Sequence, residues 1–232
     1  MRLRQTAIGV NYIDVYIRKG LYRMIEPPAP IGMEAAGVVL ESNAPGFSPG
    51  DRVAYACPPP GAYVTMRTLP AAQLVLLPDY VDEETAASEA KAELARSNSC
   101  EHPIVTRTYS FAERTRQVSG GRGADVIYDG LGREAAQENL AALATRGHWV
   151  SYGQATGAPD PMNLSEKSAT LSQPVLFHYT LEYLHQMAGH VFAALRDGIL
   201  KPEVRRYPLA AAADAHRDLE ARRTSGQIVL LV

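Results

Sequence analysis

The sequence lacks the marks of several large classes of protein. Its 232 residues hold only two cysteines, Cys57 and Cys100, with no Cys-x-x-Cys spacing and no histidine pair near them. This pattern argues against a disulfide framework and against a structural zinc site. No apolar run approaches the roughly 18 residues that cross a bilayer, and the start, MRLRQTAIGV, has no signal-peptide core. We therefore expect a cytoplasmic protein without a membrane partner.

An excess of charge of either sign is also missing. The chain has 23 Lys and Arg against 25 Asp and Glu, a formal net charge of −2, spread along its length. A basic surface that attracts phosphate backbones is therefore not expected, and we predict no nucleic-acid partner. With 46% hydrophobic residues, the composition is that of a folded globular protein of one or two domains.

The first third of the chain reads as short strands and turns, typical of a small barrel or sandwich rather than of βα units. The pattern predicts strands over 2–11 and 34–43, a tight turn leading into a strand over 46–56, and one short helix over 11–22 that stops at Gly20.

From about Glu89 the pattern changes to alternating helices and strands. A short helix and a strand are predicted over 88–105, and a helix closed by glycines over 111–123. A buried strand (124–129), a helix (133–145) and a second strand (148–153) form a βαβ unit, which requires a parallel sheet. A helix over 181–198, with Leu184, Ala188, Val191 and Leu195 on one face, precedes a final helix, turn and strand over 215–232.

One segment matches a nucleotide-binding fingerprint. Residues 130–135, GLGREA, have the form GxGxxG/A, follow a predicted strand and open a helix. In NAD enzymes an acid about 20 residues further on holds the ribose, whereas here the next strand ends in VSYGQ, without an acid. Spacing alone leaves two interpretations open, a cofactor loop and a structural turn.

The order of several blocks resembles one known family. TAIGVNYIDVYIRKGLY, GMEAAGVV, GDRVAYA, GGRGADVIYDGLG, SYGQATG, PVLFHY and YPLAAAADAHRDLEARRTSGQIVLLV look like the NADPH:quinone oxidoreductases, the zeta-crystallin-like branch of the medium-chain dehydrogenase/reductase superfamily. The resemblance implies an α/β fold in which a GroES-like β-rich catalytic domain (1–87 with 203–232) is joined to an incomplete Rossmann domain, a doubly wound parallel sheet (88–202).

The same resemblance implies missing segments. Family members begin with one further hairpin, so this chain is expected to be shortened at its N-terminus. After Ala87 the family continues through the first Rossmann strand and its glycine-rich phosphate loop, whereas here Ser88 resembles the start of a later helix. On the order of two βα units are therefore expected to be absent. The GLG of residues 130–132 then matches the loop after the fourth Rossmann strand, beside the nicotinamide ribose, and not the phosphate loop.

The resemblance implies NADPH as cofactor and assigns positions to it. Lys91 and Arg222 match residues that bind the 2'-phosphate, although a solvated helix lysine and a charged helix end explain them equally well. The expected nicotinamide-side positions, which suit packing residues as well as contacts, are Gly130, Leu131, Tyr152, Gly153, Gln154 and Phe177.

On the substrate side, Asn11, Tyr16 and Tyr22 match residues that line the quinone pocket, and they are the expected catalytic residues. An asparagine can donate a hydrogen bond to a quinone oxygen, and a tyrosine can orient the ring or relay a proton, while surface tyrosines remain the alternative for Tyr16 and Tyr22. Asp14 is expected to cap or buttress the helix. Zinc dehydrogenases carry a histidine where this chain has Met33, so no metal is expected.

Two functional hypotheses follow from the resemblance. In the first, the chain is an NADPH-dependent reductase of quinones or related enones that works by hydride transfer, with an activity limited by the missing phosphate loop. In the second, it is a catalytically impaired homologue that serves as a scaffold, a dimerisation partner or a small-ligand-binding protein. Family members commonly pair as homodimers through the sheet edge near 169–172, and the same pairing is expected here if that domain folds.

Overall fold

The computed structural model describes residues 1–56, 58–79, 100–102, 104, 110–175, 178–221, 223–224 and 226–232. The predicted helix and strand within 88–105 lie almost entirely outside these ranges. The chain forms two compact units. The first unit combines Met1–Leu94 with Tyr179–Val232, and the second is Ala95–His178. No helix in the described ranges has the length and apolar character needed to cross a membrane. The boundaries at 88 and 202 stay a prediction.

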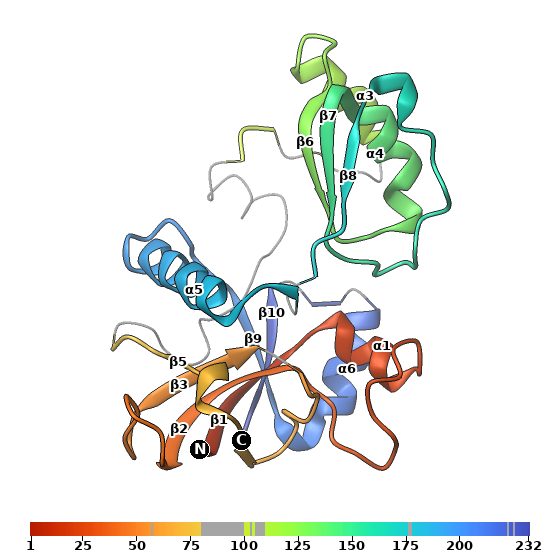
Figure 1. Cartoon of the computed structure of the whole chain (residues 1–232). Helices are drawn as coiled ribbons and strands as arrows, with labels where there is room; N and C mark the ends of the chain where they lie inside the picture. Colours follow the sequence, from red (N-terminus) through yellow and green to blue (C-terminus); the bar gives the residue numbers. More distant parts are fainter. Residues whose placement is uncertain are drawn as a thin grey trace. The chain divides into compact units, whose positions relative to one another are not determined.

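The first unit is built on one seven-stranded sheet, drawn in red, orange and blue in Figure 1. Its strands are β1 (Arg2–Val10), β2 (Glu34–Glu41), β3 (Arg52–Ala56), β4 (Met66–Thr68), β5 (Val75–Leu76), β9 (Val204–Pro208) and β10 (Gln227–Leu231). The order is β5-β3-β2-β1-β10-β9, with β4 paired to the first residues of β1. The two ends of the chain thus share one sheet, and the predicted strands over 2–11, 34–43 and the last residues are confirmed.

A local irregularity in β1 sets which of its side chains are buried. The register against β2 shifts between Gln5 and Ala7, so the usual alternation breaks and the neighbours Ala7 and Ile8 are both buried. Gln5 is buried as well, and its amide donates to the carbonyl oxygens of Ala62 (2.7 Å) and Val64. A buried amide with these partners avoids the desolvation penalty of an unpaired polar group.

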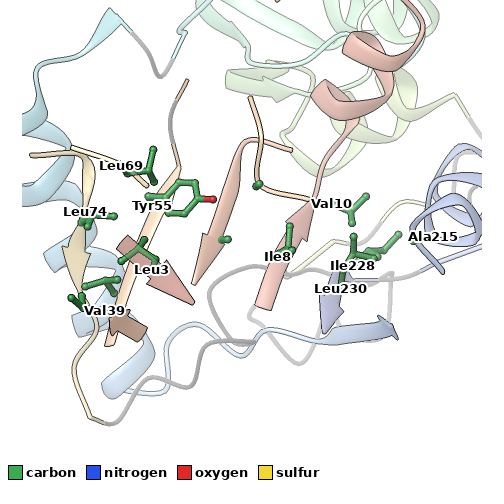
Figure 2. Close-up of a cluster of buried hydrophobic side chains, with 13 residues drawn as sticks. Leu3, Ile8, Val10, Val39, Tyr55, Leu69, Leu74, Ala215, Ile228 and Leu230 are labelled. Atoms are coloured by element: carbon green, nitrogen blue, oxygen red, sulfur yellow. The ribbon is translucent and has the colours of Figure 1, made fainter. Parts of the chain in front are cut away.

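The main core lies within this unit (Figure 2). Thirteen buried residues from the sheet strands, the loops and the C-terminal helix form one cluster, among them Leu3, Ile8, Val10, Val39, Val53, Tyr55, Leu69, Leu74, Ala215, Ile228 and Leu230. Burial of one aliphatic side chain of this size contributes about 1.5–3 kcal/mol. Residues from the first and last parts of the sequence therefore stabilise a single core.

In the described ranges of the first unit, the sheet is accompanied by the α-helices α1 (Tyr12–Arg18), α5 (Leu181–Arg196) and α6 (Ala212–Glu220). The helix α1 ends before Gly20, whose φ of +73° suits a glycine, as the sequence predicts. One side of α5 packs through Phe192 and Leu195 against the sheet residue Ala36 and its neighbour Leu77. The predicted stripe on α5 is wrong at Val191, which is 45% exposed, because the packed face is rotated toward Phe192.

The second unit contains a three-stranded parallel sheet, drawn in green and teal in Figure 1. The strands β6 (Ala124–Asp129), β7 (Leu143–Ser151) and β8 (Thr170–Ser172) lie in the order β6-β7-β8, accompanied by the helices α3 (Phe111–Val118) and α4 (Ala136–Ala142). A core of Ala136, Leu143 and Trp149 joins α4 to β7. The predicted βαβ unit is confirmed.

Two details of that unit differ from the sequence prediction. The helix over 133–145 begins as a 3-10 turn and ends at Ala142, because Leu143 enters the core as the first residue of β7. The segment 124–129 is not a buried strand, since Val126 is 48% and Tyr128 is 73% exposed. Among the described residues β6 pairs only with β7. Within β6, Ile127 packs against the core and Asp129 is buried.

Candidate functional site

The three predicted substrate residues lie along one short segment of the first unit. Asn11 caps the N-terminus of α1, where its extended backbone joins the end of β1. Tyr16 is in α1, and Tyr22 follows the helix. The rings of Tyr16 and Tyr22 meet edge to face, 5.4 Å between centroids, and the amide of Tyr22 donates to the carbonyl of Tyr16 (3.3 Å). The structure thus brings Tyr16 and Tyr22 into contact.

Asp14 anchors Asn11 from inside the protein. Its Oδ2 accepts a hydrogen bond from the main-chain N–H of Asn11 (2.9 Å) and another from the hydroxyl of Tyr63 (3.2 Å). The predicted capping role of Asp14 is therefore confirmed. The side chain is completely buried, and within the described ranges its Oδ1 has no hydrogen-bond partner. A buried acid with an unpaired oxygen is costly to ionise.

Glu34 is a second acid at the same place. It is the first residue of β2, and its Oε1 accepts from the side-chain amide of Gln227 at the start of β10 (3.3 Å). Its carboxyl group also forms a hydrogen bond with the Asn11 side chain. Asn11 is thus held by Asp14 through its main chain and by Glu34 through its side chain.

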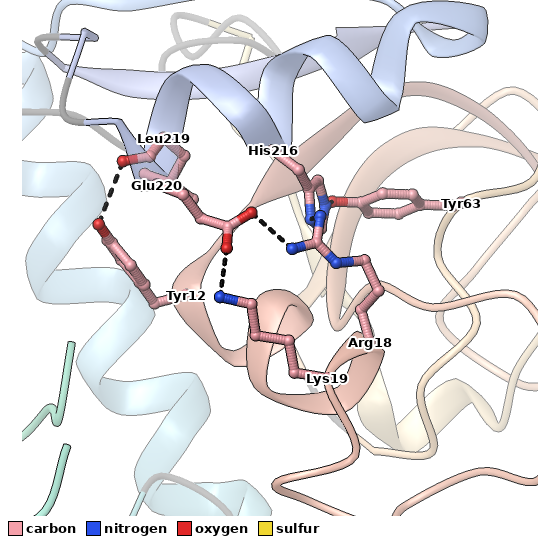
Figure 3. A network of polar contacts seen from close by, with 7 residues as sticks. All are labelled: Tyr12, Arg18, Lys19, Tyr63, His216, Leu219 and Glu220. Carbon is pink, nitrogen blue, oxygen red and sulfur yellow. Dashed lines mark hydrogen bonds and ion pairs between the residues drawn. The ribbon is translucent and has the colours of Figure 1, made fainter. Parts of the chain in front are cut away.

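A polar network links Tyr63 and the end of α1 to the C-terminal helix (Figure 3). The Tyr63 hydroxyl, which binds Asp14, also binds Nε2 of His216 (2.8 Å), and Arg18 contacts Nδ1 of the same ring (3.2 Å). Arg18 and Lys19 both pair with Glu220 at 2.5 Å. The network joins α1 to α6. His216 itself is buried, with 2% of its surface exposed.

Burial dominates the electrostatics of this cluster. It raises the pKa of Asp14 from 3.8 to about 7, and the nearby Glu34 carboxyl adds to the rise, although hydrogen bonds from Asn11 and Tyr63 oppose it. Burial likewise raises the pKa of Glu34. It lowers the pKa of His216, and the Arg18 charge lowers it further. Two acids and a histidine that favour their neutral forms thus lie around Asn11 and Tyr63.

In the second unit, the GLG segment is a closed structural turn. The carboxylate of Asp129, at the end of β6, accepts from the amides of Leu131 (2.8 Å) and Gly132 (3.3 Å). The next three amides, of residues 133–135, donate to Gly157 O, Thr156 Oγ1 and Gly132 O. Amides that already have partners cannot cradle a pyrophosphate. This geometry favours the structural turn over the phosphate loop.

The predicted nicotinamide-side residues meet at the ends of β6 and β7. The ring of Tyr152 lies against Gly130, where an added Cβ would come within 3.1 Å of it. A Cβ on Gly153 would lie 2.8 Å from the Gly130 carbonyl oxygen, so the two loops pack backbone to backbone. Gly130, Leu131, Tyr152, Gly153 and Gln154 therefore belong to one surface cluster, whereas Lys91, Phe177 and Arg222 lie outside the described residues.

Three partners of the site were not predicted from the sequence: Glu34, Tyr63 and Gln227. A signal existed for Glu34, because Gly9 interrupts a strand next to it and a glycine in a strand often marks a close approach. Tyr63 carried none, since its partner His216 is 153 residues away. No group of three or more His, Cys, Asp or Glu side chains is placed to hold a metal ion in the part of the chain that the structure describes.

Comparison with known proteins places both parts of the chain. Residues 1–79 match the alcohol dehydrogenase GroES-like domain, and residues 99–230 match the zinc-binding dehydrogenase domain. The chain is 33% identical to a 2-haloacrylate reductase from Burkholderia sp., covering 100% of this chain and 90% of that protein. It is similar to the structure of the quinone oxidoreductase from Pseudomonas syringae, with 30% identity and a TM-score of 0.93, over 100% of this chain and 90% of that one. It is also similar to the Escherichia coli quinone oxidoreductase complexed with NADPH, with 27% identity and a TM-score of 0.89, over 100% of this chain and 91% of that one.

The alignment with the Burkholderia protein is longer than this chain. It runs over 301 residues, which is 69 more than the 232 residues here, although the whole of this chain is included. That protein therefore has residues within the aligned region that lack a counterpart in this sequence. In total, 69 residues is about the length of two βα units of some 30 residues each.

Proposed function

Because the chain belongs to the quinone oxidoreductases of the medium-chain dehydrogenase/reductase superfamily, we propose that it is an NADPH-dependent reductase of quinones or related enones that binds its cofactor weakly. The fold is α/β, with a GroES-like part and a Rossmann-like parallel sheet. The observation that carries the proposal is the group of Asn11, Tyr16 and Tyr22, anchored by Asp14 and Glu34.

On this proposal, each residue of the group has a role that its chemistry allows. The Asn11 carboxamide donates to the substrate carbonyl oxygen, where negative charge develops during reduction. Tyr16 and Tyr22 offer aromatic edges and hydroxyl groups against the substrate ring. Tyr22 is 38% exposed, so a ligand can reach its side chain. Replacing Asn11 removes the donor and is expected to lower kcat/KM for the quinone by roughly 100-fold.

NADPH is proposed as cofactor because the Escherichia coli relative is a complex with NADPH. When bound, the dinucleotide supplies a hydride. The loops of Gly130 and Leu131 and of 152–154 are proposed to border the nicotinamide, with Lys91, Phe177 and Arg222 as further contacts. The pyrophosphate does not fit the GLG turn, because Asp129 and the neighbouring residues occupy its amides. Weak cofactor binding follows from the expected absence of the glycine-rich phosphate loop, which the closed GLG turn does not replace.

A specific observation also favours a second candidate. A chain that lacks 69 aligned residues and whose GLG turn is closed fits a catalytically impaired homologue that keeps the substrate site. Such a protein binds a quinone or enone as a ligand or serves as a scaffold. It differs from the first candidate in having no NADPH turnover at any cofactor concentration.

The consumption of NADPH with 1,4-benzoquinone separates the two candidates. The rate is measured at 340 nm as NADPH rises into the millimolar range, with the Escherichia coli relative as a positive control and NADH as a second donor. The reductase is supported if the rate rises with NADPH without early saturation and exceeds the rate with NADH. The rate should also drop in Asn11→Ala. No rate above the enzyme-free background, on folded protein, refutes it and leaves the impaired homologue.

A homodimer is also proposed, paired through the edge of the second sheet. In the described ranges β8 pairs only with β7, so its outer edge offers main-chain groups to a second copy. Sedimentation of the wild type and of Leu171→Pro tests this pairing, because a proline in β8 removes an edge N–H donor. A monomeric wild type would contradict it.

A further inference from the structure

The Glu34 side chain lies directly across the backbone of β1. A Cβ built on Gly9 would lie 1.9 Å from Glu34 Oε1 and 2.6 Å from its Cδ. No side chain at position 9 is compatible with this position of Glu34. A glycine inside a strand weakens it, so its presence marks a place where another group approaches the backbone closely. Gly9 makes room for the Glu34 carboxyl group.

The carboxyl group occupies that space between two amide side chains. Gln227 donates to Oε1 from β10, and the Asn11 side chain bonds to the same carboxyl group. The strands β2, β1 and β10 are neighbours in the sheet, so Glu34, Gly9 and Gln227 lie together where β1 passes into α1. The main-chain N–H of Asn11 also donates to Asp14, so Asn11 is held through both its main chain and its side chain.

We propose that Glu34 is a positioning residue for Asn11, which holds one N–H of the Asn11 carboxamide so that the second N–H faces a substrate oxygen. The inference rests on the proposed function, in which Asn11 contacts the substrate. A donor that is already oriented needs no further loss of side-chain entropy when the substrate binds. Supporting hydrogen bonds of this kind keep the groups of a site in the geometry that the reaction requires.

The Asn11 side chain donates one N–H to the Glu34 carboxyl group, and its second N–H remains for the substrate oxygen. An ionised Glu34 accepts this hydrogen bond more strongly than the protonated acid does. Burial raises the pKa of Glu34 and favours the protonated form. The titratable groups whose pKa values are raised by the charge of Glu34 are Asp14 and Tyr63. Ionisation of Asp14 adds a negative charge close by and therefore favours protonated Glu34 further.

Nuclear magnetic resonance of protein labelled with 15N-asparagine tests the inference without cofactor or turnover. The Asn11 side-chain pair is identified by its loss in Asn11→Asp. We expect its signals to move with pH in the wild type, to stay ordered in Glu34→Gln with a smaller pH response that comes from Asp14 alone, and to shift to the position of a free amide in Glu34→Ala. Glu41→Ala, on the exposed end of the same strand, is the matched control and leaves the pair unchanged.

A second variant keeps the test decisive if Glu34→Ala does not fold. Gly9→Ala displaces the carboxyl group sterically while Glu34 remains, and we expect it to move the Asn11 signals in the same direction. Asn11 signals in folded Glu34→Ala or Gly9→Ala that match the wild type would overturn the inference. Wild-type signals that do not change with pH would overturn the role of Glu34 protonation.

Substrate addition distinguishes this inference from the proposed function. Tetramethyl-1,4-benzoquinone, which has no free ring position for attack by the exposed Cys100, is titrated into each variant. No shift of the Asn11 pair in the wild type refutes the proposed substrate contact, while the pH and variant data still decide the link to Glu34. With turnover, we expect kcat/KM for the quinone to fall roughly tenfold in Glu34→Ala and to recover in Glu34→Gln with a flatter pH profile.

Discussion

Replacing Asp14 by asparagine should remove a large pH dependence from the stability of the first unit. The carboxyl group is fully buried, and its pKa rises from 3.8 to about 7 on folding. The folded protein therefore holds this proton more tightly than the unfolded chain does. Below pH 3.8 both states are protonated, and between about pH 4 and 7 only the unfolded chain releases the proton, so the free energy of unfolding falls as the pH rises.

The size of the effect follows from the change in pKa. At about 1.4 kcal/mol for each pKa unit, a rise of about 3 corresponds to a loss on the order of 4 kcal/mol between pH 4 and pH 8. Asparagine has the same shape, keeps an oxygen that accepts from Asn11 and Tyr63, and carries no charge. We therefore expect Asp14→Asn to be the more stable protein at pH 8, with the difference shrinking toward pH 4.

Hydrogen exchange measured by mass spectrometry on β1 and β10 peptides, corrected for the intrinsic pH dependence, reports the stability of this unit. Trp149 fluorescence in urea serves as an internal control, because Trp149 lies in the core of the second unit and should show no difference. Glu41→Gln is a control for loss of an exposed acid. Parallel pH curves for wild type and Asp14→Asn would refute the reasoning.

Three further predictions concern other parts of the chain. Hydrogen bonds to Lys19 and Arg18 lower the pKa of Glu220 to about 2, so Glu220 stabilises the fold above pH 4.5 and this stability is lost as the pH falls toward 2. We expect Glu220→Gln to lose less stability than the wild type over that range, in acid titrations followed by circular dichroism. The difference should be about 1 kcal/mol or less, because the ion pairs are partly exposed. Asp129→Ala leaves two loop amides without their acceptor and should destabilise the second unit by about 1–3 kcal/mol in urea followed by fluorescence, and an unchanged midpoint would contradict the closed turn. Ile127→Ala should lower the free energy of unfolding of the second unit by about 2–4 kcal/mol, because Ile127 packs against its core. Tyr128→Ser should lower it by less than about 0.5 kcal/mol, because Tyr128 is exposed. Equal losses would show that the face of β6 that carries Tyr128 is covered.

Local pattern was enough to predict the elements that hold the site. The β-rich run of β1, the glycine that ends α1 and the βαβ order of the second unit all follow from the placement of apolar and turn residues. The competing interpretation of the GLG segment was also resolved in the right direction by the family pattern, since Asp129 closes the turn. These features depend on residues that are close in sequence.

Features that depend on distant or missing partners could not be predicted. The apolar run 124–129 reads as buried because a sequence does not show which neighbours cover a strand, and the covering partners are not among the described residues. His216 is buried only because Tyr63 and Arg18, both far away in the chain, surround its ring. The role of Glu34 likewise arises from three neighbouring strands rather than from any motif.

The dissociation constant of NADPH tests the central claim most directly, namely that this chain retains the family's substrate residues but lacks a pyrophosphate cradle. Calorimetric titration is run on this chain beside the Escherichia coli relative, whose structure is a complex with NADPH. Losing two or three hydrogen bonds to a charged phosphate, at about 1.5–3 kcal/mol each, should weaken binding by roughly 100-fold or more. An affinity within about tenfold of the relative's would contradict the account.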